Sequence, residues 1–155
     1  MVKVYVEGGG DSKELHVRCR EGYRRLLENA DFQEHMPRIV ACGGRGATYA
    51  SFRTAAANQE EVSLLLVDSE DPIAPTDDPD SDLPWQHLQT RDGWERPHHA
   101  ANDQAQLMAT CMETWIMADQ AALRAVFGNG LQVSALLPER DLEQRDRHAV
   151  QNALE

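Results

Sequence analysis

The chain opens on alternating apolar and other residues and then changes to a helical period. The alternation over residues 2–6 predicts a short β-strand. A glycine-rich turn at 8–10 follows, and apolar side chains then recur at helical spacing over residues 13–29. Either Asp11 or Ser12 suits the N-cap of that helix. The segment is therefore predicted to be strand, turn and amphipathic helix.

The same change of period occurs a second time. Residues 38–42 form another short apolar run, the turn at 43–46 is rich in glycine, and the alanine-rich stretch 47–57 predicts a second helix. The run at 62–67 is the strongest strand pattern, and its continuous apolar character predicts burial on both faces. Strand and helix in alternation predict an α/β fold, with a mainly parallel sheet flanked by helices.

Beyond this strand the periodicity weakens. Residues 68–103 hold prolines and acids with two tryptophans, which predicts a long loop that packs partly against the protein body. The next apolar residues have helical spacing, but a strand at 106–112 followed by a helix from Glu113 fits nearly as well. A further helix is predicted at 121–127.

The 155 residues suffice for one domain of ordinary size. We expect an α/β domain over 1–137 that carries the acidic, proline-rich insertion 68–103. Residues 138–155 are expected to form a polar helical tail without an apolar face to complete a core.

The charge is strongly acidic and unevenly spread. The formal net charge is −11, from 15 basic and 26 acidic residues, and no lysine follows Lys13. Nine acids and no base occur between residues 60 and 82: Glu60, Glu61, Asp68, Glu70, Asp71, Asp77, Asp78, Asp80 and Asp82. This balance opposes unassisted nucleic-acid binding, which would need bound metal or a partner protein.

The cysteine positions and the hydropathy bear on disulfide bonds, zinc binding and membrane insertion. The three cysteines, Cys19, Cys42 and Cys111, are far apart and form no CxxC pair, which argues against a disulfide framework or a structural zinc site. No stretch approaches the roughly 18 apolar residues of a membrane span, and the N-terminus lacks a signal-peptide core. We expect no membrane partner and a cytoplasmic location.

Acidic residues follow two of the predicted strands. Glu7 closes the first, and Asp68, Glu70 and Asp71 close the third. Ligands of parallel sheets bind at the carboxyl ends of strands, so these acids would converge if the two strands are neighbours. Mutual repulsion would then favour a bound cation, and hard oxygen ligands suit Mg²⁺ or Mn²⁺. The competing interpretation is that each acid caps a helix or ends a strand in water, which is favoured for Asp11 alone.

Arg45 lies in a Gly-Gly-Arg-Gly turn before a predicted helix. It could hold a phosphate there, or it could be an ordinary surface arginine of a strand-to-helix turn. The residues support both interpretations equally.

Four motifs in order resemble a known family. They are Val-Glu-Gly-Gly-Gly-Asp at 6–11, Ala-Cys-Gly-Gly-Arg at 41–45, Leu-Leu-Val-Asp-Ser-Glu-Asp at 65–71, and Met-Glu-Thr-Trp with a later Ala-Asp at 112–119. Together they resemble a bacterial family, catalogued as a domain of unknown function, that is Toprim-like and related to the Toprim domains of OLD-type nucleases. The resemblance covers about residues 1–137.

The resemblance implies roles for particular residues. Glu7 on the first strand and Asp68 would be the catalytic acids. Asp68 and Glu70 would form the metal-binding pair for Mg²⁺ or Mn²⁺, and Glu7 would be a further metal ligand. The family has Asp where this chain has Glu70, so Asp71 could share the second ligand role. Further acids near the site would be Asp11 and Glu113.

The implied function is a metal-dependent nuclease or phosphodiesterase acting on nucleic acid, in bacterial anti-phage defence with an ATPase partner. The alternative is a non-catalytic partner or regulator of an ATPase or toxin. A receiver-like phospho-acceptor would need a lysine at a later strand end, which the chain lacks. The basic, Lys- and His-containing segment that follows in the family is also missing, so we expect the isolated chain to be weakly active or silent.

Overall fold

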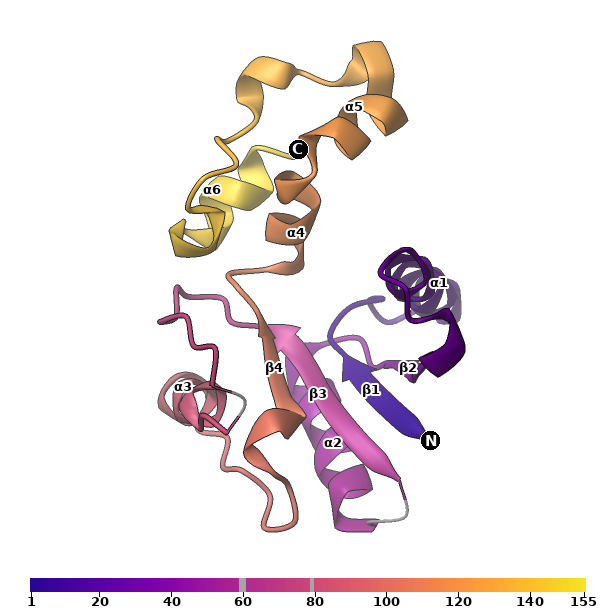
Figure 1. Ribbon diagram of the computed structural model, residues 1–155, viewed down its shortest axis with the longest axis vertical. Helices are drawn as coiled ribbons and strands as arrows, with labels where there is room; N and C mark the ends of the chain where they lie inside the picture. The colour runs from indigo at the N-terminus through magenta and orange to yellow at the C-terminus, as the bar shows by residue number, and fades with distance from the viewer. Residues whose placement is uncertain (59–60, 79) are drawn as a thin grey trace. The chain divides into compact units, whose positions relative to one another are not determined.

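The computed structural model describes residues 1–58, 61–78 and 80–155, and it confirms the predicted α/β class. Glu60 of the acidic run and Pro79 of the proline-rich segment lie outside the described residues. A four-stranded parallel sheet has the order β2-β1-β3-β4 (Figure 1). Its strands are β1 (Val2–Val6), β2 (Arg38–Ala41), β3 (Val62–Asp68) and β4 (Ala105–Met108).

Strand β1 lies inside the sheet and pairs in parallel with β2 and with β3. Val6 pairs with Ala41 of β2 on one side and with Leu66 of β3 on the other. Burial of β3 alternates, because Leu65 and Val67 are fully buried while the residues between them are partly covered. The predicted burial on both faces of β3 is therefore found in part: one face is buried, and Leu64 and Leu66 on the other face are partly buried.

The first two helices follow the apolar pattern closely. Helix α1 (Lys13–Asn29) matches the predicted range, and Ser12 caps it by accepting a hydrogen bond from the backbone N–H of Leu15 at 3.1 Å. Helix α2 (Arg45–Asn58) begins two residues earlier than predicted. Its Phe52 is fully buried and meets Tyr5 edge to face, which attaches α2 to the sheet.

The predicted loop at 68–103 contains helix α3 (Leu83–Asp92), which ends at Gly93 in the left-handed conformation. Pro84 in its first turn is compatible with a helix start. Trp85 is buried, donates from Nε1 to the carbonyl oxygen of Ala101 and contacts Phe52, so this tryptophan packs against the body as expected.

The chain divides into two compact units, one of Met1–Val67 with Asp78–Gln106 and one of Asp68–Asp77 with Leu107–Glu155. The second unit contains α4 (Met112–Ala118), α5 (Gln120–Phe127) and α6 (Arg147–Asn152). Short 3-10 helices occur at Gln33–His35, Asn102–Gln104, Gly128–Gly130, Val133–Ala135 and Leu142–Gln144. None of the described helices is both long and apolar enough to cross a membrane.

The tail contributes to the core of the second unit. Leu142 and Val150 are buried in one cluster with Cys111 and Met117. The expectation that residues 138–155 lack an apolar face was therefore wrong, because 3-10 and short helical turns bring together apolar residues that no regular period connects.

Candidate functional site

Two glycine turns close on each other at the carboxyl end of β1 and β2. Gly8 and Gly43 exchange backbone hydrogen bonds of 2.8 and 3.0 Å. Gly43 has φ of 77°, and a Cβ there would lie 2.7 Å from the carbonyl oxygen of Gly10. Only glycine fits so close an approach, and the paired turns fix Glu7 and Arg45 at this edge.

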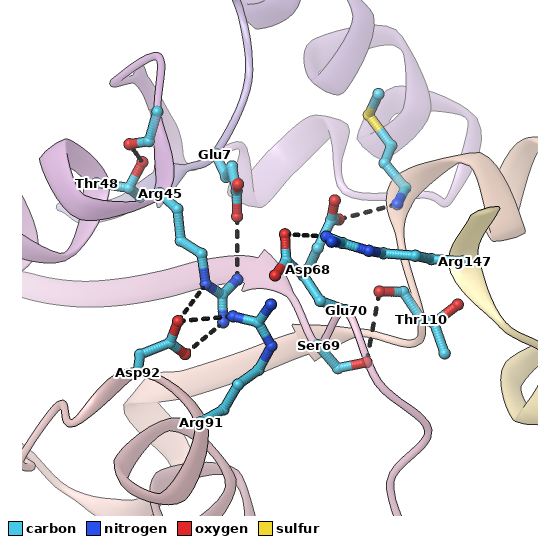
Figure 2. A network of polar contacts seen from close by, with 12 residues as sticks. Glu7, Arg45, Thr48, Asp68, Ser69, Glu70, Arg91, Asp92, Thr110 and Arg147 are labelled. Carbon is cyan, nitrogen blue, oxygen red and sulfur yellow. Dashed lines mark hydrogen bonds and ion pairs between the residues drawn. The ribbon is translucent and has the colours of Figure 1, made fainter. Parts of the chain in front are cut away.

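Arg45 is the centre of an ion-pair network in the first unit (Figure 2). Its Nε and Nη2 donate to the two oxygens of Asp92 at 2.9 and 2.7 Å, and its Nη1 donates to Glu7 at 3.2 Å. Arg91 donates to Asp92 at 2.8 Å. The Arg45 side chain is only 13% exposed, so Arg45 is not the surface arginine of one sequence interpretation.

The Arg45 guanidinium also contacts the aromatic ring of Trp94, which in turn stacks on Tyr49. The Cζ atom of Arg45 lies 5.0 Å from the ring centroid of Trp94, a cation–π distance. Tyr49 of α2 stacks on Trp94 with ring centroids 4.5 Å apart, and its hydroxyl donates to the carbonyl oxygen of Glu95 at 2.6 Å. The guanidinium is therefore restrained in position and orientation.

Arg45 and Asp92 each lie at the unfavourable end of a helix. Arg45 begins α2, where the helix dipole disfavours a cation, and Asp92 ends α3, where it disfavours an anion. Their bidentate pairing offsets both penalties. Sequence reasoning missed Asp92, because the helix that it ends, α3, was itself predicted to be loop.

Partial burial and neighbouring charges shift the pKa values of Arg45 and Asp92 in opposite directions. Burial tends to raise the pKa of Asp92, but the hydrogen bond and positive charge of Arg45, together with Arg91, lower that pKa below its ordinary value. Burial likewise tends to lower the pKa of Arg45, and hydrogen bonding and charge from Asp92 and Glu7 raise it overall. Both partners stay charged at neutral pH.

The depressed pKa of Asp92 predicts acid sensitivity of the first unit. The unfolded chain binds a proton at the ordinary carboxyl pKa of about 3.9, above the value in the folded state. The stabilising contribution is therefore complete above about pH 5 and is lost as pH falls through the folded-state pKa. Urea unfolding at successive pH values should show the midpoints of wild type and Asp92→Asn converging in acid. A constant difference between the two proteins would contradict this assignment.

A second set of polar contacts surrounds the end of β3 in the other unit (Figure 2). Asp68 accepts a hydrogen bond of 2.9 Å from the backbone N–H of Met112, the first residue of α4. Ser69 is fully buried, and its hydroxyl donates to the carbonyl oxygen of Asp71 at 2.8 Å. Asp68 and Asp71 thus begin and end a segment that Ser69 holds in place.

Glu70 occupies a strained position within this segment. Its φ is 62°, in the left-handed region that residues other than glycine rarely adopt. Its backbone N–H donates to the carbonyl oxygen of Thr110 at 2.7 Å, which holds the turn. Its carboxylate forms an ion pair with Nη1 of Arg147 in α6. Sequence reasoning missed Arg147, and the only signal was the group of arginines in the tail.

The sequence-predicted residues divide between the two units. Glu7, Asp11 and Arg45 belong to the first, and the other candidates belong to the second: Asp68, Glu70, Asp71 and Glu113. Asp11 is exposed in the turn before α1 and leaves the N-cap to Ser12. Glu113 is half-buried in the first turn of α4. Over the ranges that the structure describes, no group of three or more His, Cys, Asp or Glu side chains could hold a metal ion.

Comparison of the chain with protein-family models, with curated proteins and with solved structures found no match. The fold and the contacts define an α/β protein with a parallel four-stranded sheet. Two of its strand-end carboxylates, Glu7 and Glu70, form ion pairs with Arg45 and Arg147.

Proposed function

We propose that this chain is a Toprim-like, Mg²⁺- or Mn²⁺-dependent phosphodiesterase that acts on nucleic acid. The strand order supports the proposal, because the chain passes from β1 to β2 on one side and then crosses back past β1 to β3 on the other side. In open parallel sheets, ligands bind outside the carboxyl ends of strands at such a switch point. Glu7 follows β1 directly, and Asp68 is the last residue of β3.

The donor chemistry fits a hard divalent cation. Asp68 and Glu70 would hold the ion through carboxylate oxygens, with Asp71 available as a further ligand. Glu70 would have to exchange its partner Arg147 for the metal. When bound, the ion would stabilise negative charge on a phosphate group.

The protein's own side chains would supply proton transfer and phosphate binding. Glu7 would act as the general acid or base that moves a proton to or from the reacting oxygen. Arg45, restrained by Asp92 and Trp94, would bind a phosphate through a guanidinium of fixed orientation. The net charge of −11 opposes unassisted binding, so nucleic acid would be held through the metal or through a partner such as an ATPase.

Added Mn²⁺ tests the metal site directly. At a concentration about 100 times the dissociation constant, binding to the folded state alone should stabilise it by about 2.7 kcal/mol, roughly 5–10 °C in melting temperature. Asp68→Ala should abolish this response, whereas Asp77→Ala, an exposed acid elsewhere in the acidic run, should preserve it. A melting curve that Mn²⁺ leaves unchanged in the wild type would count heavily against the proposal.

A non-catalytic docking protein for an ATPase or toxin is the second candidate. It is favoured by the ion pairs of Glu7 and Glu70, which neutralise candidate ligands without metal, and by the lack of a three-acid cluster among the described residues. The two candidates differ in one result: the docking protein would stay silent toward nucleic acid even with Mn²⁺ and its partner present.

A further inference from the structure

Two arginines of the tail lie beside the strained turn at Glu70. Arg147 is the first residue of α6 and pairs with the Glu70 carboxylate. Arg145 is joined to the same region through its carbonyl oxygen, which accepts a hydrogen bond of 3.2 Å from the Thr110 hydroxyl. Thr110 in turn accepts the backbone hydrogen bond of Glu70. One short network thus connects both arginines to a candidate metal ligand.

The core of the second unit anchors the segment that carries these arginines. Leu142 precedes them and Val150 follows them, and both are buried against Cys111 and Met117. The carboxylate of Asp146 caps α6 by accepting hydrogen bonds from the backbone N–H groups of His148 and Ala149. The backbone on either side of the two side chains is therefore held in place.

The guanidinium of Arg145 has unused hydrogen-bonding capacity. Its Nε is buried, and within the described part of the chain it has no hydrogen-bond partner. A buried donor without a partner is costly, and an anion that accepts from it would remove this cost. Arginine also binds phosphate oxygens through its planar set of N–H donors.

We propose that Arg145 and Arg147 form a phosphate-binding site of the tail, and that Arg147 exchanges Glu70 for the phosphate when Glu70 binds metal. The inference rests on the proposed function, because it requires Glu70 to be a metal ligand. It gives the chain a cation near that ligand from its own residues 138–155. Metal and phosphate binding are thereby coupled, since both remove the Glu70–Arg147 pair.

If Arg147 exchanges Glu70 for phosphate, one substitution of Arg147 should change the affinities for Mn²⁺ and for phosphate in opposite directions. In the full chain, Arg147→Gln should tighten binding of Mn²⁺ alone by about three- to tenfold, because a competing cation is removed from Glu70. The same substitution should weaken binding of inorganic phosphate to the Mg²⁺-saturated protein at least about tenfold. Titration calorimetry measures both affinities without any activity assay.

Three further variants separate the contributions of Arg145 and Arg147 to the binding of Mn²⁺ and phosphate. Arg147→Lys keeps the charge and should leave the Mn²⁺ affinity near that of the wild type, with an intermediate loss of phosphate affinity. Arg145→Gln should weaken phosphate binding several-fold and leave Mn²⁺ binding unchanged, because Arg145 contributes no ion pair to Glu70 among the described contacts. Arg140→Gln is the matched control, since that side chain is 91% exposed and should affect neither affinity.

The outcomes distinguish the inference from the proposed function. Wild-type affinities for Mn²⁺ and phosphate in Arg147→Gln and Arg145→Gln would overturn the inference while leaving the metal site intact. Complete absence of Mn²⁺ binding in the wild type would overturn the proposed function and the inference with it. If Arg147→Gln fails to fold, wild-type phosphate binding in both Arg147→Lys and Arg145→Gln would still overturn the inference.

Discussion

Replacing Glu7 with glutamine is expected to lower the rate of metal-dependent phosphodiester cleavage by about 10²–10⁴-fold, the usual contribution of a general acid or base. Glutamine keeps the size of the side chain and an oxygen that can accept from Arg45, but it cannot exchange a proton. The loss should therefore fall on the rate more than on metal affinity. A nuclease assay on single- and double-stranded substrates across a Mn²⁺ titration, with and without an ATPase partner, measures both.

Two comparison variants sharpen this result. Asp68→Asn should instead weaken metal binding, so that added Mn²⁺ recovers part of the lost rate. Glu14→Gln changes an exposed acid in the first turn of α1 and should cleave as the wild type does. Wild-type cleavage by both Glu7→Gln and Asp68→Asn would show that any activity lies elsewhere. A silent wild type with its partner present would favour the docking function.

The regular elements could be predicted because their patterns are local. Residues 13–29 have both an amphipathic period and a capping residue, and α1 occupies that range. Helix α3 was hidden because its ten residues are flanked by prolines and acids, and because Trp85 and Leu88 alone supply its buried face. Short elements that depend on a few tertiary contacts leave little periodicity to detect.

The candidate site could be predicted only in part, for a related reason. Acids that directly follow apolar strands, such as Glu7 and Asp68, are recognisable from local order alone. Their partners come from distant positions: Arg45 is 38 residues from Glu7, and Asp92 is 47 residues from Arg45. Arg147 pairs with Glu70 only because α6 is anchored by Leu142 and Val150, which no single helical period connects.

The ion-pair network of Arg45 is expected to contribute to the free energy of unfolding of the first unit. The Asp92 side chain is 10% exposed and that of Arg45 13%, so neither charge is well hydrated. Asp92→Ala would leave the guanidinium with Glu7 but without its bidentate partner. Because breaking a largely buried pair strands one charge, we expect the free energy of unfolding to fall by about 3 kcal/mol.

Urea unfolding followed by tryptophan fluorescence measures this loss, since Trp85 and Trp94 both belong to the first unit. Glu34→Ala, which removes an exposed carboxylate of the first unit, is the matched control and should leave the midpoint nearly unchanged. The double variant Arg45→Met with Asp92→Leu should recover only part of the stability, because it removes both charges of the bidentate pair but also takes the ion-pair partner Arg45 from Glu7. If Asp92→Ala unfolds at the wild-type midpoint, the network contributes nothing to folding. The bidentate geometry would then have to be explained by phosphate binding at Arg45 alone.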